Sequence, residues 1–310
     1  MSNKVKIYMI IALSASLLLS ACAVPTSAAD SEKLRLCVTI YPLSYFADRI
    51  GGERVEIHQL IPAGAEPHDW EPTPGNIIML ENSDIFIYNG AGLEHWVSSV
   101  LPSVKSKTLT AVETAAGLDL LKMEGDCGDC GYRHQHGAAD PHIWLSPRSA
   151  TEQARAIKEA LISVDIEGKS YYESNFRDIS NQLYELDKLY SETLEPLQGK
   201  EIVVAHAAFG YLCRDYGLSQ VAVQGFFPGA DPGPADMARI IEYVRRSGIK
   251  IIFFESAESD KVARAIAAET GAEVRVLHPL ETLSESQIAA GEDYFTIMRK
   301  NLGALEKALG

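Results

Sequence analysis

Short apolar runs alternate along the chain with segments of helical period. The runs are rich in β-branched and aromatic residues and lie at 34–40, 54–61, 84–90, 201–206, 219–225, 249–255 and 272–277. Between them, for example at 147–164 and 236–247, apolar residues recur three and four positions apart, as on one face of a helix. Strands that alternate with helices predict an α/β fold with parallel-rich sheets flanked by helices.

The alternation is interrupted once, between about 168 and 197. Apolar residues keep spacings of three and four from Tyr172 to Leu194, and Pro196 and Gly199 follow. This pattern predicts one long amphipathic helix. We therefore expect an N-terminal α/β lobe at 34–166, a linking helix at 167–198 and a C-terminal α/β lobe at 199–310. Ligand chemistry should lie at the strand ends, in the cleft between the lobes.

The first residues have the features of an export signal. Lys4 and Lys6 precede an apolar run at 7–19, which is too short for a typical transmembrane helix. The run ends on Leu-Ser-Ala-Cys22, which resembles the lipobox of bacterial lipoproteins, where the cysteine is acylated. We predict a signal peptide at 1–21, lipidation of Cys22 and a flexible tether at 22–33. An unmodified cysteine behind an ordinary signal peptide is the alternative.

Composition narrows the possible functions. The chain has 310 residues, 46% of them hydrophobic, which is enough for two compact domains. Its 42 acidic and 28 basic residues give a net charge of −14, so the surface repels phosphate backbones and nucleic-acid binding is excluded as a first choice. Five cysteines are too few for a disulfide framework, and Cys37 and Cys213 are expected as buried free thiols. A tethered domain outside the membrane is suited to capture, hydrolysis or adhesion.

Three histidines lie where predicted strands end or loops begin. His68 follows the run that ends near Ile61, His142 lies between two prolines in DPHIWLSP, and His206 directly follows EIVVA. Parallel strands deliver their C-terminal loops to one edge of a sheet, so the imidazoles can converge. Zn²⁺ accepts neutral imidazole nitrogens and takes about four ligands. Each histidine taken singly also fits a capping or packing role.

Longer segments resemble a known family. They lie at 41–74, 92–96, 140–147, 206–218 and 293–309, and the most specific are PAGAEPHDWEPTP and DPHIWLSP. They resemble the metal-binding solute-binding proteins of bacterial zinc and manganese ABC transporters, over essentially the whole mature chain. The resemblance implies two α/β lobes joined by a long helix, with the metal in the cleft. It also implies a monomeric, lipid-anchored protein on the extracytoplasmic side of the cell membrane that hands the metal to an ABC permease without catalysing a reaction.

The resemblance also implies a ligand set. His68, His142 and His206 match the family's first three ligands, and manganese-type members often carry glutamate at the third. An all-nitrogen trio therefore favours Zn²⁺ over Mn²⁺, although Mn²⁺ stays possible.

The fourth ligand is left open between three choices. Glu281 in HPLETL matches the Pro-Leu-Glu of some zinc members and ranks first, although it also fits a solvated surface acid. Manganese members use an aspartate just before the last helix, where this chain has Glu292 and Asp293, which rank second. A water molecule ranks third.

Two further groups of residues are candidates for supporting roles. The glycine-rich and acidic segment 124–140 is expected as an exposed loop, which we interpret as an auxiliary zinc collector. A local disulfide or a loop without a function is the alternative. The potential metal-binding residues of the loop are Cys127, Cys130, His134 and His136.

Trp70 and Trp144 follow two of the histidines by two residues and are expected to exclude water and fix the ligands.

Two alternatives belong to other functional classes. A zinc hydrolase also uses three histidines, with an open position that activates water. No HExxH motif is present, and the sequence offers no general base near the ligands other than Glu281. A surface adhesin is the other alternative, although the sequence reveals no adhesive patch.

Overall fold

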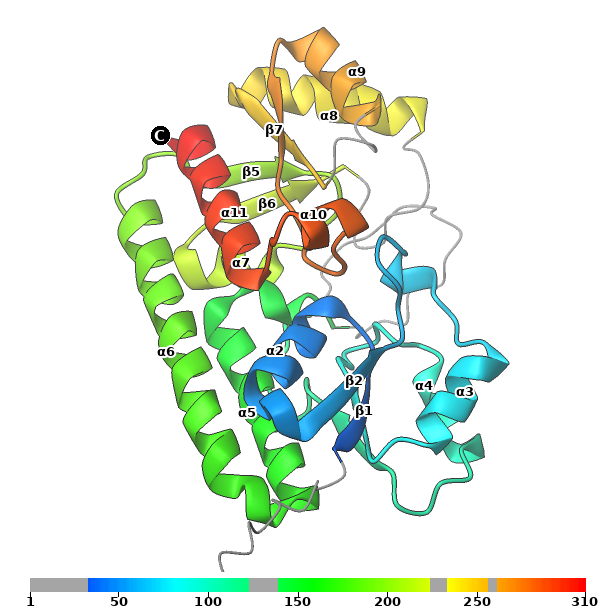
Figure 1. Ribbon diagram of the computed structural model, residues 1–310. Coiled ribbons are helices and arrows are strands. Elements are labelled where there is room, and N and C mark those ends of the chain that lie inside the picture. The colour runs from blue at the N-terminus through cyan, green and yellow to red at the C-terminus, as the bar shows by residue number, and fades with distance from the viewer. Residues whose placement is uncertain (1–32, 123–138, 224–232, 256–260) are drawn as a thin grey trace, which may run out of the picture. The chain divides into compact units, whose positions relative to one another are not determined.

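The computed structural model describes residues 33–122, 139–223, 233–255 and 261–310. It contains two parallel four-stranded sheets with helices packed on them (Figure 1). The predicted signal peptide, Cys22 and the candidate ligands at 127–136 lie outside the described residues. In the part that is described, no helix is both long and apolar enough to cross a membrane.

The first sheet has the strand order β2-β1-β3-β4, and all neighbours are parallel. Its central strands β1 and β3 are the most deeply buried, as their continuous apolar runs predict. The edge strand β4 was not predicted, because in Thr-Ala-Val-Glu only alternate positions are half-buried and the apolar signal is weak. The strands are β1 (Leu34–Val38), β2 (Val55–Gln59), β3 (Ile85–Tyr88) and β4 (Thr110–Glu113).

The second sheet repeats this topology with the order β6-β5-β7-β8, again fully parallel. Each strand falls within a run that was predicted from the sequence, so the prediction of parallel α/β sheets is confirmed. The strands are β5 (Glu201–Val204), β6 (Ser219–Ala222), β7 (Ile251–Phe254) and β8 (Glu273–Val276).

Helices cover both faces of the sheets. Helices α3 and α4 lie on one face of the first sheet, and α8 and α9 pack on one face of the second. The other faces share one continuous apolar core with α2, α5, α6, α7 and α11. The helices are α2 (Tyr41–Gly51), α3 (Pro74–Glu81), α4 (Val97–Val100), α5 (Pro147–Val164), α6 (Lys169–Leu194), α7 (Gly210–Tyr216), α8 (Pro234–Ser247), α9 (Lys261–Thr270), α10 (Glu285–Ala289) and α11 (Tyr294–Leu309).

Two helices match their sequence signals closely. Helix α5 spans the predicted 147–164, and Ser146 caps it by accepting a hydrogen bond from the backbone N–H of Ser149. Helix α6 is the predicted long helix, and its apolar stripe is buried. Tyr190 of this stripe donates a hydrogen bond of 2.6 Å to the carbonyl of Met298 in α11. Helix α6 thus fastens elements from both ends of the chain, while the exact lobe limits stay predictions.

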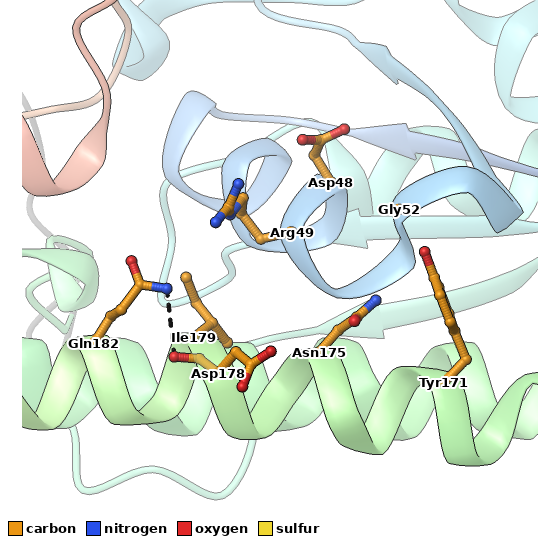
Figure 2. A pocket seen from close by; sticks show the side chains of 8 residues that line it. All are labelled: Asp48, Arg49, Gly52, Tyr171, Asn175, Asp178, Ile179 and Gln182. Carbon is orange, nitrogen blue, oxygen red and sulfur yellow. Dashed lines mark hydrogen bonds between the residues drawn. The ribbon is translucent and has the colours of Figure 1, made fainter.

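A polar cavity of about 330 Å³ lies between α2 and α6 (Figure 2). Asn175 donates a hydrogen bond of 2.9 Å to the carbonyl of Ile50, and the hydroxyl of Tyr171 accepts one of 3.3 Å from the backbone N–H of Glu53. Gly52 has φ +50°, and a Cβ atom there would lie 2.3 Å from the Tyr171 hydroxyl. These side chains fasten the end of α2 to α6.

Candidate metal centre

Four buried side chains from distant parts of the chain meet in one cluster. They are His68, His142, His206 and Glu281, and the potential ligand atoms all lie within 4.8 Å of one another. Each of the four residues is no more than 6% exposed. The structure therefore brings together the three predicted histidines and the first-ranked choice for the fourth ligand.

The backbone delivers each residue from the end of a strand or from a short turn. His206 directly follows β5, and His68 lies in the 3₁₀ turn Pro67–Asp69 in the segment after β2. His142 caps the 3₁₀ turn Ile143–Leu145 that leads into α5. Glu281 lies between β8 and α10. The cluster therefore gathers segments that leave the C-terminal ends of strands in both sheets, as expected for parallel α/β folds.

The spacing of the donor atoms fits a tetrahedral ion. Nε2 of His142 lies 3.2 Å from Nε2 of His68 and 3.3 Å from Nε2 of His206. Oε1 of Glu281 lies 3.2 Å from Nε2 of His142 and 3.5 Å from Nε2 of each other histidine. Ligands about 2.0–2.1 Å from a tetrahedral zinc ion lie about 3.3–3.4 Å apart. These five distances match that geometry, and the sixth, between the donor nitrogens of His68 and His206, is no more than 4.8 Å.

The oxygen that Glu281 contributes supports the same conclusion. Its Oε1 is buried and makes no hydrogen bond of acceptable geometry within the described residues. An unsatisfied buried carboxylate oxygen is energetically unfavourable, whereas a cation at this position satisfies it. The donor set, three imidazole nitrogens and one carboxylate oxygen, is one that zinc accepts.

Two carboxylates orient two of the imidazoles. Nδ1 of His142 lies 2.8 Å from Oδ1 of Asp140, and Nδ1 of His206 contacts Oε1 of Glu255. When Nδ1–H donates a hydrogen bond to a carboxylate, the ring is held in place and the lone pair of Nε2 points at the metal position. Asp140 and Glu255 are thus functional residues that the sequence reasoning missed.

Both carboxylates left a signal in the sequence. Glu255 ends the apolar run that forms β7, and β7 is the neighbour of β5 in the sheet, so Glu255 and His206 leave adjacent strand ends. Asp140 stands two residues before His142, and its carboxylate also accepts a hydrogen bond of 2.9 Å from the backbone N–H of His142. The order of the strands brings Glu255 to His206, and a local turn brings Asp140 to His142.

Asp140 is itself held in place from several sides. Its carbonyl accepts a hydrogen bond of 2.8 Å from the hydroxyl of Tyr211. A Cβ atom at Gly210 would lie 2.3 Å from Oδ2 of Asp140, so only glycine allows this close approach. Asn89, which follows β3, donates a hydrogen bond of 2.9 Å to the carbonyl of Pro141. The His142 segment is thereby fixed against the first sheet.

The cluster shifts the protonation equilibria of its members. Burial opposes the charged form of His206, yet Glu255 and Glu281 outweigh it and raise its pKa to about 10. Burial likewise opposes the charge on His142, but Asp140 and Glu281 raise its pKa. Burial dominates at His68 and lowers its pKa. Burial disfavours the Glu281 carboxylate as well, but the surrounding imidazoles hold its pKa well below the usual range. The same two carboxylates favour a proton on His206, so a metal ion would compete with that proton.

The second-ranked ligands lie elsewhere. Asp293 caps α11 by accepting a hydrogen bond of 2.8 Å from the backbone N–H of Thr296, and it accepts another of 3.1 Å from the hydroxyl of Tyr45. Glu292 pairs with Lys300. Neither acid belongs to the group of donor atoms within 4.8 Å.

The two tryptophans have different surroundings. The Trp144 ring is fully buried and its centroid lies 5.4 Å from that of His142. The Trp70 ring is half-buried, its centroid lies 5.5 Å from that of Trp96, and it packs against both the apolar cluster under α3 and α4 and the shared core. Cys37 and Cys213 are buried free thiols, as predicted.

Two parallel α/β sheets and a buried cluster of three histidines and one glutamate are typical of a metal-binding protein. The profile of the ZnuA family, described as zinc-uptake complex component A, periplasmic, matches residues 36–308. The chain therefore belongs to this family.

Individual relatives agree with this assignment. The chain is 37% identical over 300 residues to the high-affinity zinc uptake system protein ZnuA of Bacillus subtilis, covering 94% of each protein. It is 36% identical over 306 residues to the zinc-binding lipoprotein AdcA of Streptococcus pneumoniae, covering 97% of this chain but 60% of AdcA.

Solved structures share the fold. The Zn(II)-bound ZnuA-like domain of AdcA from S. pneumoniae superposes with a TM-score of 0.79 at 35% identity, covering 89% of this chain and 99% of that domain. The laminin-binding protein of Streptococcus agalactiae, described as having adhesin and metal-transporting activity, reaches a TM-score of 0.78 at 28% identity, covering 90% of this chain and all of that one.

The hydrogen bond from His142 to Asp140 predicts a measurable contribution to zinc binding. Asp140→Ala should weaken zinc binding by about 10- to 100-fold, because Nδ1 of His142 loses the acceptor that fixes its tautomer. Asp140→Asn keeps an oxygen acceptor without the charge and should lose less. Competition titration with a chelator of known affinity measures both, and unchanged affinity in the alanine variant would contradict the assigned role.

Proposed function

We propose that this protein captures Zn²⁺ outside the cytoplasmic membrane and delivers it to an ABC permease. The observation that carries the proposal is the buried set of three imidazole nitrogens and one carboxylate oxygen, spaced for a tetrahedral ion. The relatives named for zinc uptake and zinc binding support the same function. In this proposal His68, His142, His206 and Glu281 are the ligands. The ion lies between an N-terminal lobe at 34–166 and a C-terminal lobe at 199–310.

The nature of the donors favours zinc over manganese. Manganese is a harder cation that prefers oxygen ligands, whereas three of these four donors are nitrogen. A manganese-specific protein would be expected to place a second carboxylate among the donors. The nearby carboxylates of Asp140 and Glu255 instead contact the Nδ1 atoms of His142 and His206.

The same donor set favours binding over catalysis. A catalytic zinc site keeps one position open for water, whereas a site with four protein ligands is closed. Glu281, the only general base that the sequence offered for a hydrolase, is itself the fourth donor here. The laminin-binding relative indicates that this fold can also serve adhesion, but no feature of the described residues favours adhesion in this chain.

We predict that substitution of the proposed ligands weakens zinc binding, whereas substitution of histidines and acids outside the cluster does not. His206→Ala and Glu281→Ala should each lower zinc affinity by orders of magnitude, because either change removes one of four donors. Zinc should also raise the melting temperature of the unsubstituted protein far more than that of either variant. Competitive titration with zinc and manganese measures affinity and preference together.

Matched controls are available on the same chain. His58 and His95 are partly exposed and each lies 3.7 Å from a surface glutamate, so their alanine variants should bind zinc normally. Glu292→Gln and Asp293→Asn should also keep zinc affinity, because these acids lie outside the cluster. Normal titration by Glu281→Ala together with a loss in Asp293→Asn would reverse the ranking of the fourth ligand.

We also propose that the protein is anchored by a lipid on Cys22 and acts as a monomer on the extracytoplasmic side. The export signal and the lipobox-like sequence support the anchor, and one relative is named a lipoprotein. Cys22→Ala should release the protein from the membrane fraction and leave zinc affinity unchanged, since Cys22 precedes the domain by a tether. Membrane fractionation and the mass of the mature chain test this. Cys127→Ser is the matched control and should stay anchored, whereas an unaltered location of Cys22→Ala would refute the lipid anchor.

The loop at 124–140 is proposed as an auxiliary zinc collector. The support is its composition, because two thiols and two imidazoles within ten residues are good zinc ligands. Deletion of residues 125–137 should remove a second, weaker zinc-binding event and leave the tight one intact, as calorimetric titration would reveal. An unchanged stoichiometry would show that the loop has another role, such as a local disulfide, or none.

A further inference from the structure

The segment that carries Glu281 is fixed at three successive points. At its start, Asn301 of α11 exchanges two hydrogen bonds with the backbone of His278, of 2.9 and 2.8 Å. In its middle, the indole Nε1–H of Trp144 donates a hydrogen bond of 2.7 Å to the carbonyl of Pro279. At its end, the backbone N–H of Tyr41 donates one of 3.2 Å to the carbonyl of Glu281. Two of these points come from the N-terminal half of the chain.

The backbone inside this segment is strained. Leu280 has φ +59°, in the left-handed region that residues with a Cβ rarely adopt. Such a conformation persists only where the surrounding contacts over-determine it. The two residues on either side of Leu280 are both held by hydrogen bonds. Trp144 holds the carbonyl of Pro279, and Tyr41 holds the carbonyl of Glu281. The side chain of Glu281 points into the cluster from a backbone that these contacts hold.

Trp144 contacts one proposed ligand, His142, and the segment that carries another, Glu281. Its ring packs against the ring of His142, and its indole nitrogen holds the segment two residues before Glu281. Its own carbonyl accepts a hydrogen bond of 2.6 Å from the buried hydroxyl of Tyr294 in α11. The side chain is 0% exposed, so none of these bonds competes with water.

We propose that Trp144 is a positioning residue for the Glu281 ligand, acting through the hydrogen bond from its indole N–H to the carbonyl of Pro279. This inference rests on the proposed function, because it takes Glu281 as a zinc ligand. Glu281 belongs to the C-terminal half of the sequence, but the bond ties its segment to the elements that carry His142. The indole nitrogen of Trp144 therefore has a role of its own beside that of the apolar ring.

The test is a double-mutant cycle on zinc affinity. Trp144→Phe keeps an aromatic ring beside His142 but removes the donor to Pro279. It should weaken zinc binding by about 10- to 100-fold, the range typical of groups that orient metal ligands. In a Glu281→Ala background the same substitution should change zinc affinity by less than about 2-fold, because no carboxylate is left to position. Trp96→Phe is the matched control, because Nε1 of Trp96 is buried without a hydrogen-bond partner in the described part of the chain.

A second readout separates positioning from general stability. Cobalt substituted for zinc absorbs strongly when four-coordinate, so Trp144→Phe should reduce its visible bands, whereas Trp96→Phe should not. Tyr294→Phe, which removes the hydrogen bond to the carbonyl of Trp144, should weaken zinc binding in the same direction and also depend on Glu281. The melting temperature of each metal-free variant shows whether it is folded.

The outcomes are distinct. An equal loss of zinc affinity from Trp144→Phe with and without Glu281 means that the tryptophan acts on the fold or on His142, and overturns the proposal. Unchanged zinc affinity in Trp144→Phe overturns it as well. Normal zinc binding by Glu281→Ala alone instead refutes Glu281 as a ligand, and so tests the proposed function separately from the role of Trp144.

Discussion

Four buried donor atoms that converge on one point need positive charge between them. The rest of the structure holds the residues that carry these atoms in place. Nε2 of His142 and Oε1 of Glu281 lie 3.2 Å apart at the centre of the cluster. Buried polar groups in a medium of low dielectric constant are unfavourable unless they are satisfied. A divalent cation satisfies all four donors together, and it competes with the proton that Glu255 and Glu281 favour on His206 by raising its pKa.

The elements around the cluster hold the donors ready before any metal binds. The C-terminal ends of parallel strands deliver the ligand segments, and Asp140 and Glu255 fix two imidazole rings. Trp144 and Tyr41 hold the segment of Glu281 through its backbone. Preorganisation of this kind lowers the ordering cost of binding, so a closed site with four ligands holds its ion tightly.

The long helix and the shared core explain how distant segments can be held so firmly. Helix α6 buries one stripe of residues, and Tyr190 of that stripe bonds to α11 near the C-terminus. The acidic surface, with a net charge of −14, is at most a favourable background for collecting cations. The chemistry belongs to the buried residues rather than to the surface charge.

The local pattern of the sequence was sufficient for most of the fold. Periodicities of two and 3.6 residues reflect which face of a strand or helix is buried, so every strand of the two sheets except β4, and helices α5 and α6, were predicted within a few residues. Strand β4 was missed because an edge strand buries little and leaves little apolar signal. His68, His142 and His206 were found because strand ends and rigid prolines mark the places where a parallel fold presents ligands.

The sequence by itself determined the α/β class, the long helix, the histidine trio and a ranked choice for the fourth donor. Only the tertiary structure decided that Glu281 lies in the cluster while Asp293 caps a helix. It also revealed that Asp140 and Glu255 orient the imidazoles and that Trp144 reaches the carbonyl of Pro279. Local patterns record burial along one element, whereas a contact between residues 135 positions apart depends on how the elements pack in three dimensions.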